Sequence, residues 1–253
     1  MSANSKIEWT THTYNCWWGC IEDGPECDNC YARAFSKRTG HDVWGLGPRR
    51  FFGDAHWKEP LKWNAAAAAL GVHHRVFCGS MMDIAERRSD AVGEQMDAER
   101  ARLWSLIKAT PNLDWLLLSK RPQNFSTVLP VETERLPNVW LGTTAGTREG
   151  WEKRVKYLRK LNPVVRFVSV EPQLEAIDGV DLHGIDWVIQ GGESGPGARE
   201  FKPEWARSMR DQCSAANVAY FFKQWGGRLK KETGRELDGR THDEFPTWRA
   251  AAE

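Results

Sequence analysis

The stretch NVWLGTTAGTREGWEKRVKYLRKLNPVVRFVSVEP, residues 138–172, holds two apolar runs separated by one amphipathic segment. The runs at 138–144 and 165–172 are apolar on both faces, which is typical of buried parallel strands. The segment at 147–162 begins with Thr147, a candidate N-cap, and then places apolar side chains at helical spacing. The stretch therefore predicts a strand–helix–strand unit. The buried stripe of its helix is Trp151, Val155, Leu158 and Leu161.

The same alternation continues on both sides of this unit. Further helices are expected at 89–110, with Ser89 as the candidate N-cap, and at 202–217, where Pro203 suits a first turn. Alternating strands and helices with short links predict parallel strands joined by right-handed crossovers. Six or seven such units predict an α/β fold, a partial (β/α)6–7 TIM-like barrel rather than a closed eightfold one. The other expected strands are 6–15, 74–80, 114–120, 186–193 and 218–225.

Chain length, net charge and the distribution of apolar residues indicate the domain organisation and the cellular location. The chain has 253 residues and a formal net charge of +1, so no global field favours a nucleic acid or a membrane. No segment resembles an interdomain linker, and we expect one domain over residues 1–253 with a C-terminal extension from about 226 to 253. No stretch approaches the roughly 20 apolar residues that span a bilayer. We therefore expect a soluble, cytoplasmic protein without a membrane partner.

Four of the six cysteines lie in the segment YNCWWGCIEDGPECDNCYA, residues 14–32. In a reducing cytosol such a cluster indicates metal binding or redox chemistry rather than disulfides. Four thiolates would form a closed structural zinc site, whereas three would hold a four-iron cluster with one iron open. Spacing alone slightly favours zinc, but a loop after the first strand, at the barrel mouth, favours chemistry. The spacing is C-x3-C-x6-C-x2-C, formed by Cys16, Cys20, Cys27 and Cys30 of the expected cluster loop, residues 16–31.

Polar residues gather where the expected strands end, which is where parallel α/β folds bind ligands. In QGGESGPG, residues 190–197, consecutive glycines would let the backbone approach a ligand, and Glu193 can accept from an ammonium or hydroxyl group. The alternative is that these residues form ordinary caps and tight turns. The charged residues that follow or end an apolar run, and so need a partner, are Lys120, Glu171, Glu193 and Lys223.

The chain as a whole resembles the phage-associated three-Cys-motif family of unknown function, which is similar to radical S-adenosylmethionine (SAM) enzymes. The resemblance implies that Cys20, Cys27 and Cys30 hold a [4Fe–4S] cluster and that Cys16 is an extra cysteine. Two features differ from the main radical SAM pattern, namely the first gap of six residues and Asn29 in place of an aromatic residue. The matching blocks are WWGC with ECDNCYA, VFCGSMMDIAE, WLLLSKRP, PNVWLGTTAGTRE, RFVSVEPQLEAID, IDWVIQGGESGPGAR, YFFKQWGG and LDGRTHDEFP.

The resemblance also implies an activity and its cofactors. The enzyme would use the cluster and SAM to generate a 5′-deoxyadenosyl radical, with electrons from a reductant protein. Lys120, Arg121 and Lys223 would receive an anionic substrate, or would instead pair with Glu171 and Glu193. The candidate SAM-binding residues are Gly191, Gly192 and Glu193 for its methionine end and Ser80, Ser119 and Thr144 for its polar rim.

Phage association suggests a nucleic acid substrate, in base modification or lesion repair. The segment GLGPRRFFGDAHWK, residues 45–58, mixes arginines with aromatic residues, as surfaces that track a backbone and stack bases do. The alternative is a loop whose aromatic residues plug the open side of the barrel. Two rival functions stay open: a non-catalytic nucleic-acid-binding protein with a structural zinc, and a radical SAM enzyme that acts on a peptide or small metabolite. The residues concerned are Arg49, Arg50, Phe51, Phe52 and Trp57.

Overall fold

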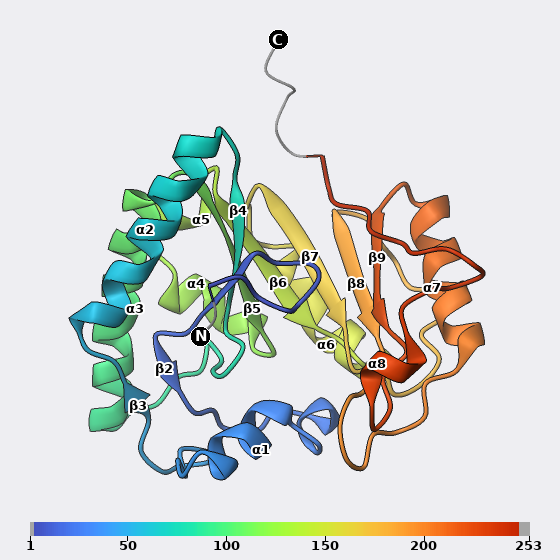
Figure 1. The fold of residues 1–253 in the computed structure, drawn as a ribbon, viewed down its shortest axis with the longest axis horizontal. Coiled ribbons are helices and arrows are strands. Elements are labelled where there is room, and N and C mark those ends of the chain that lie inside the picture. Colours follow the sequence, from blue (N-terminus) through green and yellow to red (C-terminus); the bar gives the residue numbers. More distant parts are fainter. Residues whose placement is uncertain (1–2, 248–253) are drawn as a thin grey trace. The chain divides into compact units, whose positions relative to one another are not determined.

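The computed structural model describes residues 3–247 (Figure 1). The chain divides into two compact units. No helix in this described range is long and apolar enough to cross a membrane. Unit 1 comprises Met1–Asp23, Ala32–Leu141 and Leu161–Val164, and unit 2 comprises Gly24–Tyr31, Gly142–Lys160 and Val165–Glu253.

Within residues 3–247, the main sheet has seven strands in the order β1-β4-β5-β6-β7-β8-β9. The pairings of β1 with β4 and of β4 with β5 in unit 1 are parallel, as are those of β7 with β8 and of β8 with β9 in unit 2. The predicted α/β organisation with parallel strands is therefore confirmed. The strands are β1 (His12–Tyr14), β4 (His74–Cys78), β5 (Leu113–Ser119), β6 (Val139–Thr144), β7 (Val165–Val170), β8 (Trp187–Gly191) and β9 (Ala219–Gln224).

The first strand is much shorter than the predicted range 6–15, because the residues before it form turns. The backbone N–H of Ser5 donates to the Thr11 carbonyl, and that of Thr10 donates to the Ile7 carbonyl. These local bonds use groups that a longer strand would have paired with β4. A second, two-stranded antiparallel sheet joins β2 (Trp17–Trp18) to β3 (Arg50–Phe51). Its strands are too short for alternation to indicate them in the sequence.

In unit 1, α2 (Asp54–Leu70) and α3 (Ala91–Ala109) run side by side next to β4 and β5 (Figure 1). The N-cap of α3 is Asp90 and not Ser89, because the Asp90 carboxylate accepts from the Gly93 N–H at 3.0 Å. The short elements of this part are η2 (Pro122–Asn124), α4 (Phe125–Val128), α5 (Val131–Glu134) and α1 (Tyr31–Arg38), which begins in unit 2.

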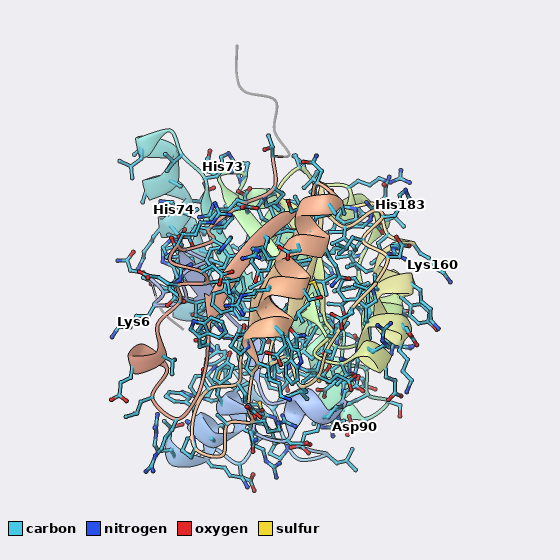
Figure 2. All side chains as sticks on the ribbon, turned by 90° about the vertical axis from the view of Figure 1, so that its right-hand side faces the viewer. Lys6, His73, His74, Asp90, Lys160 and His183 are labelled. Atoms are coloured by element: carbon cyan, nitrogen blue, oxygen red, sulfur yellow. The ribbon has the colours of Figure 1, made fainter. Side chains whose placement is uncertain are left out.

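In unit 2, the predicted helix cap and first turn are confirmed. Thr147 caps α6 (Arg148–Leu158) by accepting from the Gly150 N–H at 3.0 Å. Pro203 opens α7 (Pro203–Ala215), which lies over β8 and β9 in the view of Figure 2. The C-terminal segment turns back along β9, where Asp243 forms an antiparallel bridge with Phe221. The remaining elements are η1 (Pro25–Cys27) and α8 (Lys230–Thr233).

Candidate active site

The backbone around Cys20 is fixed by close packing in unit 1. Gly19 has φ +114°, and a Cβ at this position would lie 2.1 Å from the Val43 carbonyl oxygen, so only glycine fits before Cys20. The Gly19 N–H donates to the Met81 carbonyl at 3.0 Å, and the Cys20 carbonyl accepts from the Gly45 N–H at 2.9 Å. The orientation of Cys20 is therefore set by the backbone on both sides of it.

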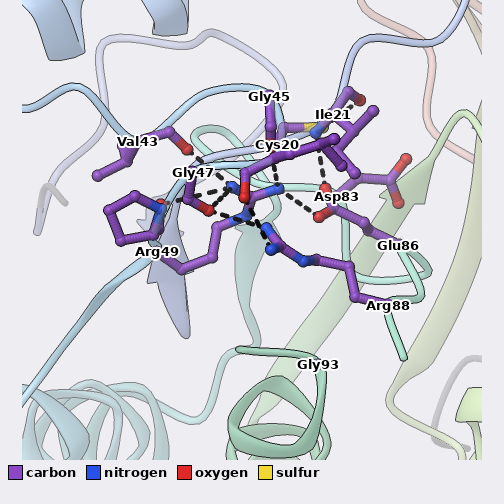
Figure 3. A network of polar contacts seen from close by, with 12 residues as sticks. Cys20, Ile21, Val43, Gly45, Gly47, Arg49, Asp83, Glu86, Arg88 and Gly93 are labelled. Atoms are coloured by element: carbon purple, nitrogen blue, oxygen red, sulfur yellow. Dashed lines mark hydrogen bonds and ion pairs between the residues drawn. The ribbon is translucent and has the colours of Figure 1, made fainter. Parts of the chain in front are cut away.

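A buried ion pair between Arg49 and Glu86 supports the same segment (Figure 3). The two side chains are 0% and 1% exposed and lie 2.5 Å apart. Glu86 also accepts from the Ile21 N–H at 2.8 Å, while Arg49 donates to the carbonyls of Val43 and Gly45 at 3.0 Å each. A guanidinium held in this way serves the fold, and Arg49 is not available to a nucleic acid.

The Cys20 sulfur faces a cation. Arg121 Nη1 lies 3.9 Å from Cys20 Sγ, and Arg121 Nη2 donates to the Ile21 carbonyl at 2.7 Å. Asp83 holds the guanidinium at 2.8 Å and accepts in turn from the Ser119 hydroxyl. Burial and the charge of Asp83 raise the pKa of Cys20, and Arg121 acts in the opposite direction. Arg121 is thus placed to stabilise a thiolate at Cys20.

The surroundings of Cys16 are of a different kind. Its side chain is fully buried in unit 1, and its thiol lies beside that of Cys78. Burial raises the pKa of Cys16, and the contact with Cys78 adds to the effect. A thiol in such a place behaves as an ordinary core residue.

Cys27 and Cys30 share one turn in unit 2. The Cys27 N–H donates to the Gly24 carbonyl at 3.1 Å, and the Cys30 N–H donates to the Cys27 carbonyl at 3.2 Å. The turn is anchored through the buried Glu26, whose Oε1 accepts from Arg154 at 2.8 Å and from the Gly146 N–H at 3.0 Å. Helix α6 and the loop after β6 therefore fix the segment that carries two of the predicted ligands.

In the predicted ligand-binding element, Glu193 and Gly192 already contact other residues of unit 2. The Glu193 carboxylate accepts from Arg199 and Asn29, and these hydrogen bonds outweigh burial and lower its pKa. A Cβ on Gly192 would lie 2.1 Å from the Trp225 carbonyl oxygen. The glycine is therefore needed for packing against the chain that leaves β9.

The two charges predicted at the ends of β7 and β9 form a pair. Lys223 donates to Glu171, and their side chains are only 13% and 16% exposed. Gln224 donates to the Gly192 carbonyl at 3.2 Å. The Tyr31 hydroxyl lies close enough to both Cys30 and Glu171 for their charges to act on it. The Glu171–Lys223 pair and the cysteine turn are thus neighbours within unit 2.

The remaining predicted residues are divided between the units. In unit 1, Ser80 accepts from the Asn15 amide at 2.9 Å and Ser119 donates to Asp83. In unit 2, the Thr144 carbonyl accepts from Arg154 at 3.0 Å. Arg49 and Arg121 were expected to meet a nucleic acid and an anionic substrate, whereas they hold the Cys20 segment. Arg154 and Arg199, which hold the turn that carries Cys27 and Cys30, were not predicted, because each comes from a distant part of the chain. Unit 1 holds Cys20, Ser80, Ser119 and Lys120, and unit 2 holds Cys27, Cys30, Thr144, Glu171, Gly191, Gly192, Glu193 and Lys223.

The donor chemistry of these cysteines fits thiolate ligation of a metal. Two thiols share a turn, and a third lies beside a guanidinium. Among residues 3–247, no three His, Cys, Asp or Glu side chains gather into a group that could hold a metal ion. Cys20 is in unit 1 and the other two cysteines are in unit 2. Their joint role as metal ligands stays a prediction.

The fold resembles that of known proteins of solved structure. A solved structure of a spore photoproduct lyase variant matches with a TM-score of 0.50 and 13% sequence identity, over 83% of this chain and 62% of the lyase chain. This match shows a likeness of fold and confirms the predicted partial TIM-like barrel. The chain spans about three fifths of the length of the lyase. A second lyase variant matches with a TM-score of 0.46 and 13% identity, over 78% and 59% of the two chains.

The family follows from the sequence. The chain belongs to the family described as Protein of unknown function (DUF5131), whose model matches residues 4–246. No curated protein gives a significant match.

Proposed function

We propose that the protein is a radical SAM enzyme whose [4Fe–4S] cluster is held by Cys20, Cys27 and Cys30. The proposal rests on one observation: three of the four loop cysteines have surroundings that suit a metal ligand, and the fourth is a buried core residue. Cys20 lies beside Arg121, and Cys27 and Cys30 share an anchored turn, whereas Cys16 is sealed in the core next to Cys78. Three ligands leave one iron open, which is what SAM chemistry needs. The radical-SAM-type fold supports the same assignment.

The protein side chains have positioning roles in this proposal. When bound, the cluster and SAM would supply a 5′-deoxyadenosyl radical that removes a hydrogen atom from the substrate. Arg121 donates toward the Cys20 sulfur and orients it. Ser80, Ser119, Thr144, Gly191, Gly192 and Glu193 are the residues that we propose for the SAM pocket.

Three charged residues are proposed to act on the substrate: Lys120, Glu171 and Lys223. Lys223 and Glu171 already form a largely buried pair, so an anionic group that reaches Lys223 would have to compete with Glu171. Lys120 follows β5, and its backbone N–H donates to Asp83 at 3.2 Å. Its backbone is therefore attached to the same network that holds Arg121.

We propose a nucleic acid as the substrate, by base modification or lesion repair, in keeping with the resemblance to phage-associated proteins. Unit 1 offers a surface that supports this choice. Arg50 lies over the rings of Trp18 and Phe52 at 4.6 and 5.2 Å, and Arg38 lies over Phe35 at 5.4 Å. The Phe35 side chain is 38% exposed. Cations combined with aromatic rings bind single strands through phosphate contacts and base stacking.

The activity is tested with protein reconstituted with iron and sulfide under anaerobic conditions. We expect the reduced protein to convert SAM into 5′-deoxyadenosine, measured by chromatography, and we expect nucleic acid to increase the yield. Cleavage of SAM that nucleic acid does not stimulate would shift the proposal to a peptide or small metabolite. Salt-sensitive nucleic acid binding by a zinc-loaded protein that never takes up iron would support the non-catalytic rival.

The proposed surface is tested separately by nucleic acid binding to Arg50→Ala. We expect weaker binding of a fluorescent single-stranded oligonucleotide and a smaller dependence of affinity on salt. Lys62→Ala is the matched control, because Lys62 is an exposed cation of unit 1 paired with Glu59 on α2. Equal affinities of both variants and the parent protein would remove this surface from the proposal.

A further inference from the structure

The loop after β8 is bound to the cysteine turn by two charged residues of unit 2. Arg199 forms a fork on Glu193, with Nε at 2.9 Å from Oε2 and Nη2 at 2.6 Å from Oε1. The same guanidinium donates to the Pro25 carbonyl at 3.0 Å and to Asp28 at 3.2 Å. Arg199 thus connects Glu193 to two residues of the turn that carries Cys27 and Cys30.

A second connection runs through Asn29, the residue between the two cysteines and next to Cys30. Its Nδ2 donates to Glu193 Oε2 at 3.0 Å and to the Gly197 carbonyl at 3.0 Å. Gly197 has φ +79°, which turns the loop back toward Asn29. Glu193 therefore holds the turn both directly and through Arg199.

These contacts are strong compared with the bonds inside the turn. Glu193 is only 5% exposed and the Arg199 side chain 33%, so the charge-assisted hydrogen bonds between them are partly shielded from solvent. The backbone bonds of the turn itself are single i→i+3 contacts between neutral groups, as in Cys30 N–H to the Cys27 carbonyl. Without Glu193 and Arg199, the turn would be held by these bonds and by Glu26 alone, and its Cys30 end would sample more conformations.

We infer that Glu193 and Arg199 form a clamp that sets the positions of the Cys27 and Cys30 thiols before a metal binds. Both are positioning residues, since they act through the turn. Holding ligands in place in advance lowers the entropy lost on metal binding and slows metal release. The inference rests on the proposed function only for the identity of the metal, because the clamp acts on the thiols of the metal-free protein.

The test measures the reactivity of each cysteine in the reduced, metal-free, full-length protein. The chain is treated with iodoacetamide, and the labelling rate of every cysteine is followed by mass spectrometry. Arg199→Met should speed the labelling of Cys27 and Cys30 by about tenfold, the factor that corresponds to loss of a charged hydrogen bond. Arg199→Lys, which keeps the charge but not the fork, should give an intermediate rate.

Two further variants test whether Glu193 and Arg199 act together. Glu193→Gln should also speed the labelling of Cys27 and Cys30. The double variant Glu193→Gln/Arg199→Met should label these cysteines no faster than Arg199→Met alone, because both changes open the same clamp. Additive effects on the logarithm of the rate would contradict a shared clamp.

Arg207→Met is the matched control. Arg207 also pairs with a carboxylate in unit 2, since its Nε and Nη2 both donate to Asp238 Oδ1, at 3.0 and 2.8 Å, but it lies on α7 and the contacts described for it do not include the turn. We expect its Cys27 and Cys30 labelling rates to match those of the parent protein. Equal rates in Arg199→Met and Arg207→Met would overturn the clamp. So would an equal acceleration of the buried Cys213, which reports general loosening of unit 2.

Iron retention gives a second readout for the reconstituted protein. Arg199→Met should lose iron to a chelator several times faster than Arg207→Met, with Arg199→Lys between them. A protein that never takes up iron would defeat the radical SAM proposal, yet it would leave the labelling result of the metal-free chain intact. The two failures can therefore be told apart.

Discussion

At the scale of single residues, the two cysteines on either side of the WWG motif differ in environment. Cys16 is 0% exposed beside Cys78, whereas the Cys20 sulfur faces Arg121 at 3.9 Å. Spacing in the sequence left both available as ligands. The two cysteines differ in burial, which cannot be read from their spacing in the sequence.

We therefore expect Cys16→Ser to retain its cluster and Cys20→Ser to lose it. Iron per chain and visible absorbance, measured after anaerobic reconstitution, check this. A serine hydroxyl in the core costs about 1–3 kcal/mol of unfolding free energy, so the fold of Cys16→Ser is verified by circular dichroism. Equal loss of iron from both variants would favour a closed site of four thiolates.

Two histidines of unit 1 make stability depend on pH. Burial lowers the pKa of His12 to about 4, and the neighbouring His74 contributes; burial lowers the pKa of His56 to about 4 as well. Between pH 6.5 and 4 these histidines bind protons in the unfolded chain but not in the folded chain. The free energy of unfolding should therefore fall with falling pH in this window, by at most about 1.4 kcal/mol per pH unit for each histidine.

Urea unfolding at pH 7, 6 and 5 measures this dependence. The slope of the free energy of unfolding against pH should become smaller in His12→Gln, because His12 no longer takes up a proton on unfolding. His183 is exposed and serves as the control, so His183→Gln should keep the slope of the parent protein. A slope that does not change in His12→Gln would show that other groups cause the acid sensitivity.

At the scale of elements, the buried pair Glu26–Arg154 connects the cysteine turn to α6. The Glu26 side chain is fully buried and that of Arg154 is 10% exposed. Arg154→Met removes one partner and leaves a buried carboxylate, which typically costs about 3–5 kcal/mol of unfolding free energy. Lys153→Met, on the exposed side of the same helix, should change it by less than about 0.5 kcal/mol. Similar midpoints for both variants in urea would mean that this pair does not anchor the turn.

The elements show what local sequence could predict. The unit at 138–172 was found because its strands are apolar and its helix begins with a Thr cap, and all three elements are present. The strand expected at 6–15 is confined to His12–Tyr14, since hydrogen bonds within residues 5–11 replace strand pairing. The loop expected at 45–58 contains β3 and the start of α2, where Trp57 is buried rather than exposed.

The sequence predicted which strand ends carry the residues of the candidate site. It did not predict which side chains these residues contact. The Glu171–Lys223 pair is one of the two outcomes that the sequence allowed. Arg199 was not predicted, because only the folded loop brings its guanidinium to Glu193 and Asp28. Contacts of this kind depend on tertiary structure, and neither periodicity nor capping signals report them.

At the scale of the whole molecule, the sequence predicts a single domain. Strand β6 contributes Val139–Leu141 to unit 1 and Gly142–Thr144 to unit 2, and the strand order runs through both. We expect one cooperative unfolding transition, with coincident midpoints by tryptophan fluorescence and far-UV circular dichroism. Both units contain tryptophans, among them Trp115 in unit 1 and Trp187 in unit 2, so the fluorescence follows both units together. Two separated transitions would show that the units unfold as independent domains.

The identity of the metal that the loop cysteines bind is tested most directly by the metal content and visible spectrum of protein produced without oxygen. We expect about four irons per chain, a broad iron–sulfur absorbance and a change in that absorbance when SAM is added. One zinc per chain, with no visible absorbance and no iron uptake on reconstitution, would contradict this expectation.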